Sequence, residues 1–254
     1  MTSVSSGYLP LTGRSVLVTG ARGDIGRATV HLLASRGARV IAVDRHDMLP
    51  PPGESHDGVA WIAGDVTDES SVRSFVAQAL ALAGTIDILV NNAGVTGPML
   101  ALPHLTLQDF TRVFAVNVQG VFLGMKHVIP HMRDTGSGCI VNMASTAGLA
   151  ATPLASAYIA SKHAVIGLTR AAAAECASGG IRVNCVAPGP IEGSMMNAML
   201  DGLASVGDVV RTRIPAGRFG SPDEVARVIA FLASDDASHM HGAVIPVDGG
   251  RTAV

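Results

Sequence analysis

The feature that most constrains this chain is a glycine-rich turn between a short apolar strand and a helix. Residues 15–19 predict the strand, and residues 20–26 then read Gly-Ala-Arg-Gly-Asp-Ile-Gly. Residues 27–36 predict the helix, and a second apolar strand at 39–43 leads to Asp44. Glycines let a backbone approach a pyrophosphate closely, and a helix N-terminus favours its negative charge. We therefore expect a βαβ unit that binds a dinucleotide.

Asp44 indicates which dinucleotide is bound. It follows Gly26 at close to the spacing of about 20 residues expected of the acid that binds the adenosine ribose. Its carboxylate would accept hydrogen bonds from the ribose hydroxyls and would repel a 2′-phosphate. The sequence thus predicts NAD, and Arg22 and Arg45 leave NADP open as the less favoured cofactor.

Apolar runs and helical patterns alternate along the rest of the chain. Strands are expected at 59–63, 87–90, 139–144, 181–186 and 243–247, and helices at 69–83, 106–132, 155–175 and 221–234. Hydrophobic residues make up 48% of the sequence and charged residues 15%, which suits a sheet buried on both faces. We expect the α/β class, a doubly wound parallel sheet of about seven strands with helices on both faces (Rossmann-like). No linker divides residues 1–254, so one domain is predicted.

Three polar side chains stand out in a stretch of small apolar residues from Ser145 to Lys162. Tyr158 and Lys162 are four apart in a predicted helix, so they share one face. A nearby ammonium lowers the pKa of a phenol, which is ordinarily about 10, and suits it to proton exchange with an alcohol or ketone. Ser145 follows the strand at 139–144, at the strand end where open α/β sheets bind ligands. Spacing alone leaves open that Tyr158 and Lys162 form an ordinary surface pair.

The long helix at 106–132 contains two unusual residues. Asn117 lies in its middle, where Asn is a poor helix former that often bonds the backbone instead. A solvent-facing position and a functional role both remain open for Asn117 from this segment alone. Pro130 predicts a kink or break in the last turn.

Charge and composition exclude several kinds of partner. The net charge is −2 and no basic block occurs, so nothing indicates nucleic-acid binding. We find no uninterrupted apolar run of 18 residues and no signal-peptide pattern in residues 1–10, and we expect a cytoplasmic protein without a membrane span. The three cysteines lie in apolar segments and predict buried thiols. The histidines show no metal-ligand spacing, so no metal is expected.

Taken together, these motifs resemble the short-chain dehydrogenase/reductase family, in its single-domain branch. The resemblance covers roughly residues 11–250. The motifs that carry it are Thr19-Gly20-Ala-Arg-Gly-Asp-Ile-Gly26, Asp65-Val66, Asn91-Asn-Ala-Gly94, Asn117, Ser145, Tyr158-Ile-Ala-Ser-Lys162, Pro188-Gly189 and Val247-Asp-Gly-Gly250. Their occurrence in this order argues against the surface-pair interpretation of Tyr158 and Lys162.

The resemblance implies a catalytic set. Tyr158 is the general acid and base, and Lys162 lowers its pKa and binds the nicotinamide ribose. Ser145 bonds the reacting oxygen, and Asn117 holds a water that links Lys162 to solvent. The implied cofactor contacts are Gly20, Arg22, Asp24, Ile25, Gly26, Asp44, Asp65, Val66, Asn91, Ala93, Gly94, Tyr158, Lys162, Pro188, Gly189, Ile191 and Ser194. A homotetramer, joined through the long helices and the C-terminal strand, is implied as well.

This chain departs from the family pattern at two places. Asp24 stands where the family usually has glycine, and we expect its carboxylate to turn away from the pyrophosphate. Gly193 stands where the family often has a Thr that bonds the nicotinamide carboxamide, and Ser194 is the candidate to take that role.

Three apolar segments are the expected pocket: 95–102, 147–154 and a variable segment at 191–214. They predict a neutral, fairly hydrophobic alcohol or ketone as substrate. For Met195, Met196 and Met199 we expect at least one to pack in the core. The predicted function is an NAD-dependent oxidoreductase that interconverts a secondary alcohol and its ketone. The alternatives are an NADPH-dependent 3-oxoacyl-carrier-protein-type reductase and a non-enzymatic dinucleotide sensor or scaffold.

Overall fold

The computed structural model describes residues 11–50, 58–200 and 210–254. Residues 1–10, on which the signal-peptide prediction rests, and the middle of the 191–214 segment lie outside these ranges. One sheet has the strand order β3-β2-β1-β4-β5-β6-β7, and every pairing is parallel. The strands are β1 (Ser15–Thr19), β2 (Arg39–Asp44), β3 (Val59–Ala63), β4 (Ile88–Asn91), β5 (Gly138–Met143), β6 (Ile181–Pro188) and β7 (Val244–Val247). The predicted seven-stranded parallel sheet is confirmed.

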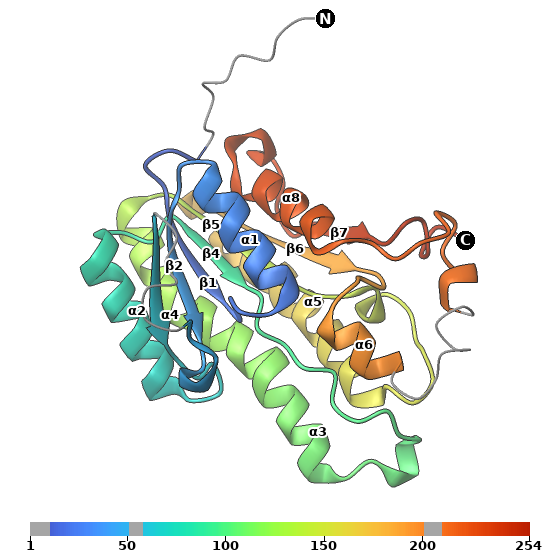
Figure 1. Ribbon diagram of the computed structural model, residues 1–254. Helices are drawn as coiled ribbons and strands as arrows, with labels where there is room; N and C mark the ends of the chain where they lie inside the picture. Colours follow the sequence, from blue (N-terminus) through green and yellow to red (C-terminus); the bar gives the residue numbers. More distant parts are fainter. Residues whose placement is uncertain (1–10, 51–57, 201–209) are drawn as a thin grey trace, which may run out of the picture.

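Helices cover both faces of this sheet (Figure 1). The α-helices of the described residues are α1 (Asp24–Ser35), α2 (Glu69–Ala83), α3 (Leu107–Phe114), α4 (Gly120–Thr135), α5 (Ser156–Cys176), α6 (Ser194–Leu200) and α8 (Pro222–Ala233). The strand order reverses between β1 and β4, and open sheets of this kind bind ligands beyond the carboxyl ends of the strands at that point.

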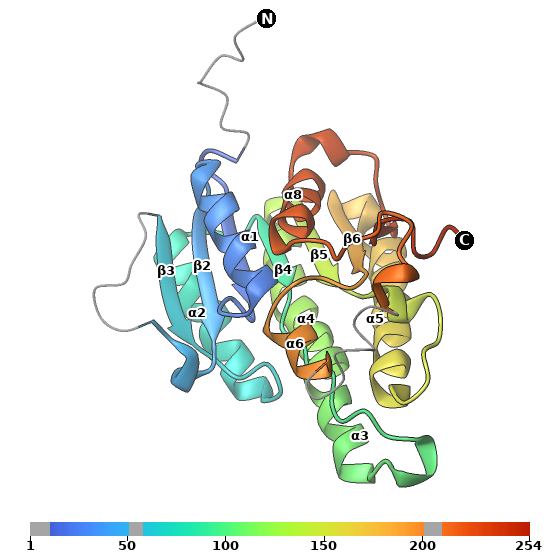
Figure 2. The ribbon, with the colours of Figure 1, turned by 45° about the vertical axis from the view of Figure 1, so that its right-hand side comes forward.

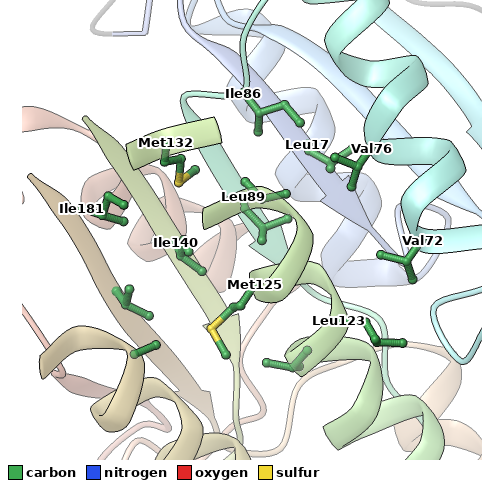
Figure 3. Close-up of a cluster of buried hydrophobic side chains, with 14 of the residues drawn as sticks. Leu17, Val72, Val76, Ile86, Leu89, Leu123, Met125, Met132, Ile140 and Ile181 are labelled. Carbon is green, nitrogen blue, oxygen red and sulfur yellow. The ribbon is translucent and has the colours of Figure 1, made fainter. Parts of the chain in front are cut away.

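Side chains alternate across the strands and build one core on each face. In β1, Val16 and Val18 belong to the cluster under α1 and α8, whereas Leu17 belongs to the cluster under α2, α4 and α5. Figure 3 shows the second cluster, with Leu89 and Ile140 of the sheet beneath Met125 of α4. Because both faces are covered, the central strands β1, β4 and β5 are fully buried, whereas the edge strands β3 and β7 are only partly buried.

Most elements lie where the sequence predicts them. α2 has the predicted bounds, and α5 is displaced by one residue at each end. β7, which contains Pro246, is an edge strand, where a residue without an N–H is tolerated. Pro130 does not end its helix: it is exposed, and α4 continues to Thr135.

The helix from Leu107 to Thr135 is continuous through a π-helical turn at Ala115–Gln119. By length and composition it could cross a membrane, since an 18-residue window in it has a mean hydropathy of 1.2. However, 44% of that window is buried inside the fold, and Val121, Met125 and Val128 pack in the core. Such burial is typical of a core helix, and the absence of a membrane span stays a prediction.

Candidate active site

The glycine-rich turn lies against the end of β4. Gly20 has a φ of +63°, and a Cβ atom placed on it would lie 2.6 Å from Ala93 Cα. The side-chain amide of Asn92 donates hydrogen bonds to the carbonyls of Thr19, at 3.1 Å, and Gly20, at 2.8 Å. Only glycine fits this turn at position 20. Asn92 therefore stabilises the turn. It was not among the predicted site residues, although its position beside Asn91 in the Asn-Asn pair could have indicated a role.

α1 begins at Asp24, three residues earlier than predicted. Gly23 is the N-cap, and Gly26 is buried in the first turn, where a Cβ atom would lie 2.9 Å from Ala21 Cα. Ile25 is half-buried and packs against the core under α1. The first N–H groups of α1 thus stand next to the glycines, which fits the binding of a pyrophosphate.

Asp44 ends β2 beside this turn. Its two carboxylate oxygens accept hydrogen bonds from the backbone N–H groups of Arg22, at 2.8 Å, and Arg45, at 2.9 Å. The guanidinium of Arg22 lies 5.9 Å from the centre of the Trp61 ring, and Arg45 pairs with Asp47 at 3.0 Å. Each carboxylate oxygen keeps a lone pair, so the group can still accept bonds from two ribose hydroxyls.

Asp65 and Val66 follow β3 at the same edge of the sheet. One oxygen of Asp65 accepts bonds from the N–H and the hydroxyl of Thr67, both at 2.8 Å, and its side chain is exposed. Val66 packs against α4, where a Cβ atom on Gly120 would lie 2.9 Å from it. The two residues thus shape the edge beside α4, where the resemblance implies cofactor contacts.

Asn91 has a different side-chain role from its neighbours. It is buried, and its amide donates a 2.8 Å hydrogen bond to Asn142 on β5, inside the core. Asn142 in turn donates to Thr169 of α5 at 3.0 Å. The Asn91 side chain is therefore occupied by a buried polar network, so a cofactor contact at Asn91 would have to come from its backbone.

Asn117 is fully buried in the π-helical turn. Its oxygen accepts a bond from Val95 N–H at 2.8 Å, and its nitrogen donates to Val95 O and to Ser161 Oγ, both at 2.9 Å. A Cβ atom on Gly94 would lie 3.4 Å from the Asn117 oxygen and 3.5 Å from Lys162 Nζ. This excludes the solvent-facing alternative for Asn117. Ser161 is a second residue that the sequence analysis left out.

Ser145, Tyr158 and Lys162 meet beyond the end of β5. The Ser145 hydroxyl donates to Pro188 O at 3.3 Å and accepts a bond from Ala147 N–H at 3.1 Å. Lys162 Nζ lies 5.6 Å from the centre of the Tyr158 ring and donates to Met143 O at 2.8 Å. The side chain of Lys162 is buried, so Tyr158 and Lys162 are not a solvated surface pair.

Burial governs the protonation of both groups. It raises the pKa of Tyr158 above its ordinary 10, against the lowering effect of a hydrogen bond from Ser145. It lowers the pKa of Lys162 from 10.5 to about 8. The neutral phenol therefore predominates in the free protein at neutral pH. The expectation that Lys162 lowers the pKa of Tyr158 is wrong for the free protein, because the effect of burial on the phenol is the larger one.

The segment after β6 completes the site. The N–H of Gly189 donates to Val247 O at 3.0 Å, which joins the end of β6 to β7, and Ile191 pairs with Gly220 in an isolated bridge. Ser194 opens α6 and is bonded to Asp24 rather than to any group of β6. The structure thus brings the predicted residues of this segment to the edge that also carries Ser145. Among the described residues, no three His, Cys, Asp or Glu side chains group as metal ligands would.

Known proteins share both the sequence and the architecture of this chain. A family model described as enoyl-(acyl carrier protein) reductase matches residues 20–252. The cis-4-hydroxycyclohexanecarboxylate dehydrogenase of Sinomonas cyclohexanicum is 42% identical over 245 residues, which cover 95% of this chain and 97% of that protein. The 3-oxoacyl-[acyl-carrier-protein] reductase of Thermotoga maritima is also 42% identical over 245 residues, 94% of this chain and 98% of that protein. The chain belongs to the short-chain dehydrogenase/reductase family. It is an NAD(P)-dependent oxidoreductase that acts on CH–OH groups.

Solved structures of this family agree with the fold. The crystal structure of levodione reductase has a TM-score of 0.90 and 37% identity, and the match covers 96% of this chain and 99% of that chain. A gluconate 5-dehydrogenase from Burkholderia cenocepacia in complex with NADP and tartrate has a TM-score of 0.91 and 34% identity, with coverage of 97% and 98%. A 3-ketoacyl-(acyl-carrier-protein) reductase from Brucella melitensis complexed with NADH has a TM-score of 0.88 and 34% identity, with coverage of 95% and 99%. Both kinds of nicotinamide dinucleotide therefore occur among the relatives of this short-chain dehydrogenase/reductase.

Proposed function

We propose that this protein is an NAD-linked dehydrogenase that interconverts a secondary alcohol and its ketone, with Tyr158 as the general acid and base. The observation that carries the proposal is the meeting of Ser145, Tyr158 and Lys162 beyond β5. A half-buried tyrosine whose phenol lies beside a hydroxyl and an ammonium suits proton exchange with a substrate oxygen. A dinucleotide sensor has no need of such a phenol.

Each polar residue of the site has its own role in this reaction. In oxidation, the Tyr158 phenolate accepts the hydroxyl proton of the alcohol, while the Ser145 hydroxyl donates a hydrogen bond to the same oxygen. NAD, when bound, supplies the hydride acceptor. Lys162 keeps a positive charge near the phenolate, and Asn117 holds the chain at Val95 beside them. In reduction the neutral phenol donates its proton.

The environment of Asp44 supports NAD over NADP. Its carboxylate is held by two backbone N–H groups, and its charge would meet a 2′-phosphate at close range. The two arginines that could neutralise that phosphate have partners, Trp61 for Arg22 and Asp47 for Arg45. This arrangement also argues against an NADPH-dependent 3-oxoacyl-carrier-protein-type reductase. That function remains the alternative because the chain is similar to the Thermotoga maritima enzyme.

Exposed apolar side chains support a neutral, fairly hydrophobic substrate. The three expected pocket segments carry large hydrophobic residues that are exposed: Met99, Leu100, Leu102, Leu149, Leu154 and Met195. Two of these segments are joined, since Leu100 N–H donates to Leu154 O at 2.9 Å. Apolar side chains left uncovered around a polar catalytic group are typical of a site for small organic molecules.

The deciding experiment follows the absorbance of reduced nicotinamide with a panel of cyclic and aliphatic secondary alcohols and ketones. NAD(H) and NADP(H) are run in parallel, with Tyr158→Phe as the matched inactive control. The wild type is expected to turn over a substrate with NAD(H), whereas Tyr158→Phe is expected to show no such turnover. Preference for NADP(H) with 3-oxoacyl thioesters would favour the alternative. Binding of NADH without turnover of any substrate would favour the sensor.

A cytoplasmic homotetramer is part of the same proposal. Leu107 and Phe122 expose apolar surface on α3 and α4, and β7 leaves one sheet edge unpaired among the described residues. The three cysteines are free and buried, which suits a reducing compartment. Light scattering on the purified protein tests the tetramer, and cell fractionation tests the location.

A further inference from the structure

The two departures from the family pattern, Asp24 and Gly193, touch each other in the folded protein. A Cβ atom placed on Gly193 would lie 2.7 Å from Asp24 Cγ and 3.0 Å from Asp24 Cβ. Any larger residue at 193 would therefore overlap the Asp24 side chain. Gly193 also has a φ of +147°, a conformation that L-residues rarely adopt. Both the side chain at 24 and the backbone conformation thus favour glycine at 193.

The Asp24 carboxylate is bonded across to the segment after β6. One oxygen accepts hydrogen bonds from the N–H of Ser194, at 2.7 Å, and from its hydroxyl, at 2.8 Å. The other oxygen lies 3.9 Å from the guanidinium of Arg27, one turn further along α1. These donors offset the negative charge that Asp24 places beside the glycine-rich turn. They also tie the first turn of α1 to the first residue of α6.

We propose that Asp24 is a positioning residue that fixes the start of α6, and that Asp24 and Gly193 are a single compensated exchange. The family pattern has glycine at position 24 and a side chain, often Thr, at position 193. This chain has the side chain at position 24 and the glycine at position 193. The segment that Asp24 holds carries Ser194 and the exposed Met195 of the expected pocket. Figure 2 shows α6 at the end of the sheet where α1 begins, in keeping with the bond between Ser194 and Asp24. The inference rests on one part of the proposed function, the binding of NADH, and only in the second of the two tests below.

The first test is amide hydrogen exchange on the free, full-length protein. Asp24→Gly removes the acceptor, so exchange in residues 191–200 should quicken by about tenfold or more, the size expected when a charged hydrogen bond is lost. Asp24→Asn keeps an oxygen acceptor for Ser194 N–H and should retain most of the protection. Asp223→Gly is the matched control, because Asp223 also lies in the first turn of a helix, α8, and is exposed. Equal exchange in Asp24→Gly and the wild type would overturn the proposal.

The second test is a double-mutant cycle with NADH binding, followed by fluorescence. Asp24→Gly and Gly193→Thr should each weaken NADH binding, the first by loosening the segment and the second by overlap with Asp24. The double variant, which restores the family pattern, should bind NADH more tightly than the product of the single losses implies. A coupling of about tenfold is expected for residues in direct contact. Purely multiplicative losses would mean that the two departures are independent.

These measurements separate the inference from the proposed function. Neither amide exchange nor NADH binding requires turnover, so a wrong substrate or a wrong general base leaves both interpretable. If Gly193→Thr does not fold, exchange in Asp24→Gly and Asp24→Asn still decides the matter.

Discussion

Lys162 holds its ammonium nitrogen 5.6 Å from the centre of the Tyr158 ring, on the same face of α5 and one turn away. The same nitrogen donates to Met143 O, so the lysine is anchored to the end of β5 while it faces the phenol. Burial makes this pair costly, since it raises the pKa of Tyr158 and lowers that of Lys162. A fold retains such a pair most readily when chemistry depends on it.

Tyr158→Phe should greatly lower turnover and leave NADH binding intact. The substitution removes the hydroxyl that exchanges the proton and keeps the ring, so kcat should fall by about 10²- to 10⁴-fold, the usual contribution of a general acid–base group. Steady-state kinetics and fluorescence titration with NADH check the two halves separately. A variant that retains substantial activity would exclude Tyr158 as the acid and base.

Lys162→Met should change stability in a pH-dependent way. In the folded protein the pKa of Lys162 is about 8, against 10.5 for an ordinary lysine, so the unfolded state binds more protons between these values. The wild type therefore carries the full cost of the buried ammonium below pH 8 and loses it as the pH approaches 10.5. The stability of the wild type relative to Lys162→Met should rise across this window.

Urea unfolding of both proteins at several pH values measures this difference. Lys126→Met is the control, because Lys126 is half exposed and pairs with Glu69 at the surface. A difference between the wild type and Lys162→Met that is flat between pH 8 and 10.5 would contradict the depressed pKa.

Local patterns predicted much of this protein. The bounds of α2, the common face of Tyr158 and Lys162, and the strand ends that hold Ser145 and Asp44 follow from periodicity and turn residues close in sequence. Pro246, which has no N–H to donate to a neighbouring strand, likewise lies on an edge strand. Such features depend on neighbouring residues, and the rest of the chain does not alter them.

Contacts between distant segments were not predictable in this way. The bond of Ser194 N–H to Asp24 joins α1 to a segment after β6, and the direction of the Asn91 side chain depends on Asn142 of the neighbouring strand. The expectation that one of the three methionines of α6 packs in the core is wrong, because no residue of α6 is buried. A short amphipathic segment does not reveal which face will be covered until its neighbours are placed.

Asp44→Ala should shift the cofactor preference toward NADP. Removal of the carboxylate takes away the repulsion of the 2′-phosphate and two acceptors for the ribose hydroxyls, so the ratio of kcat/KM for NADP to that for NAD should rise by about tenfold or more. Asp134→Ala, an exposed change on α4, is the control for general effects of charge. An unaltered ratio in Asp44→Ala would show that another residue selects the cofactor.

Ser194→Ala tests whether this hydroxyl takes the role of the missing Thr. The Ser194 hydroxyl donates to Asp24, and its lone pairs remain able to accept a bond from a carboxamide N–H. Loss of one neutral hydrogen bond should weaken NADH binding by about two- to tenfold, while the backbone N–H of residue 194 stays on Asp24. NADH affinity equal to that of the wild type would remove Ser194 from the cofactor site.

Ser221→Ala should lower stability by about 1 kcal/mol, the usual cost of a lost N-cap. The Ser221 hydroxyl accepts a bond from Glu224 N–H at 3.3 Å, and the Glu224 carboxylate accepts one from Ser221 N–H at 2.8 Å, which together form a capping box. Arg218 beside Glu224 holds the pKa of that carboxyl at about 2, so the box stays ionised across the neutral range. α8 covers one face of the sheet, and its loosening should therefore lower the Tm by about 2–4 °C.

Thermal unfolding monitored by circular dichroism measures this loss. Ser178→Ala is the matched control, since Ser178 is exposed in the short turn after α5 and caps no helix. Ser221→Asp should recover most of the stability, because an aspartate also accepts a bond at the N-cap and carries a charge that the helix N-terminus favours. If Ser221→Ala and Ser178→Ala lower the Tm equally, the capping box contributes nothing beyond the general effect of removing a hydroxyl.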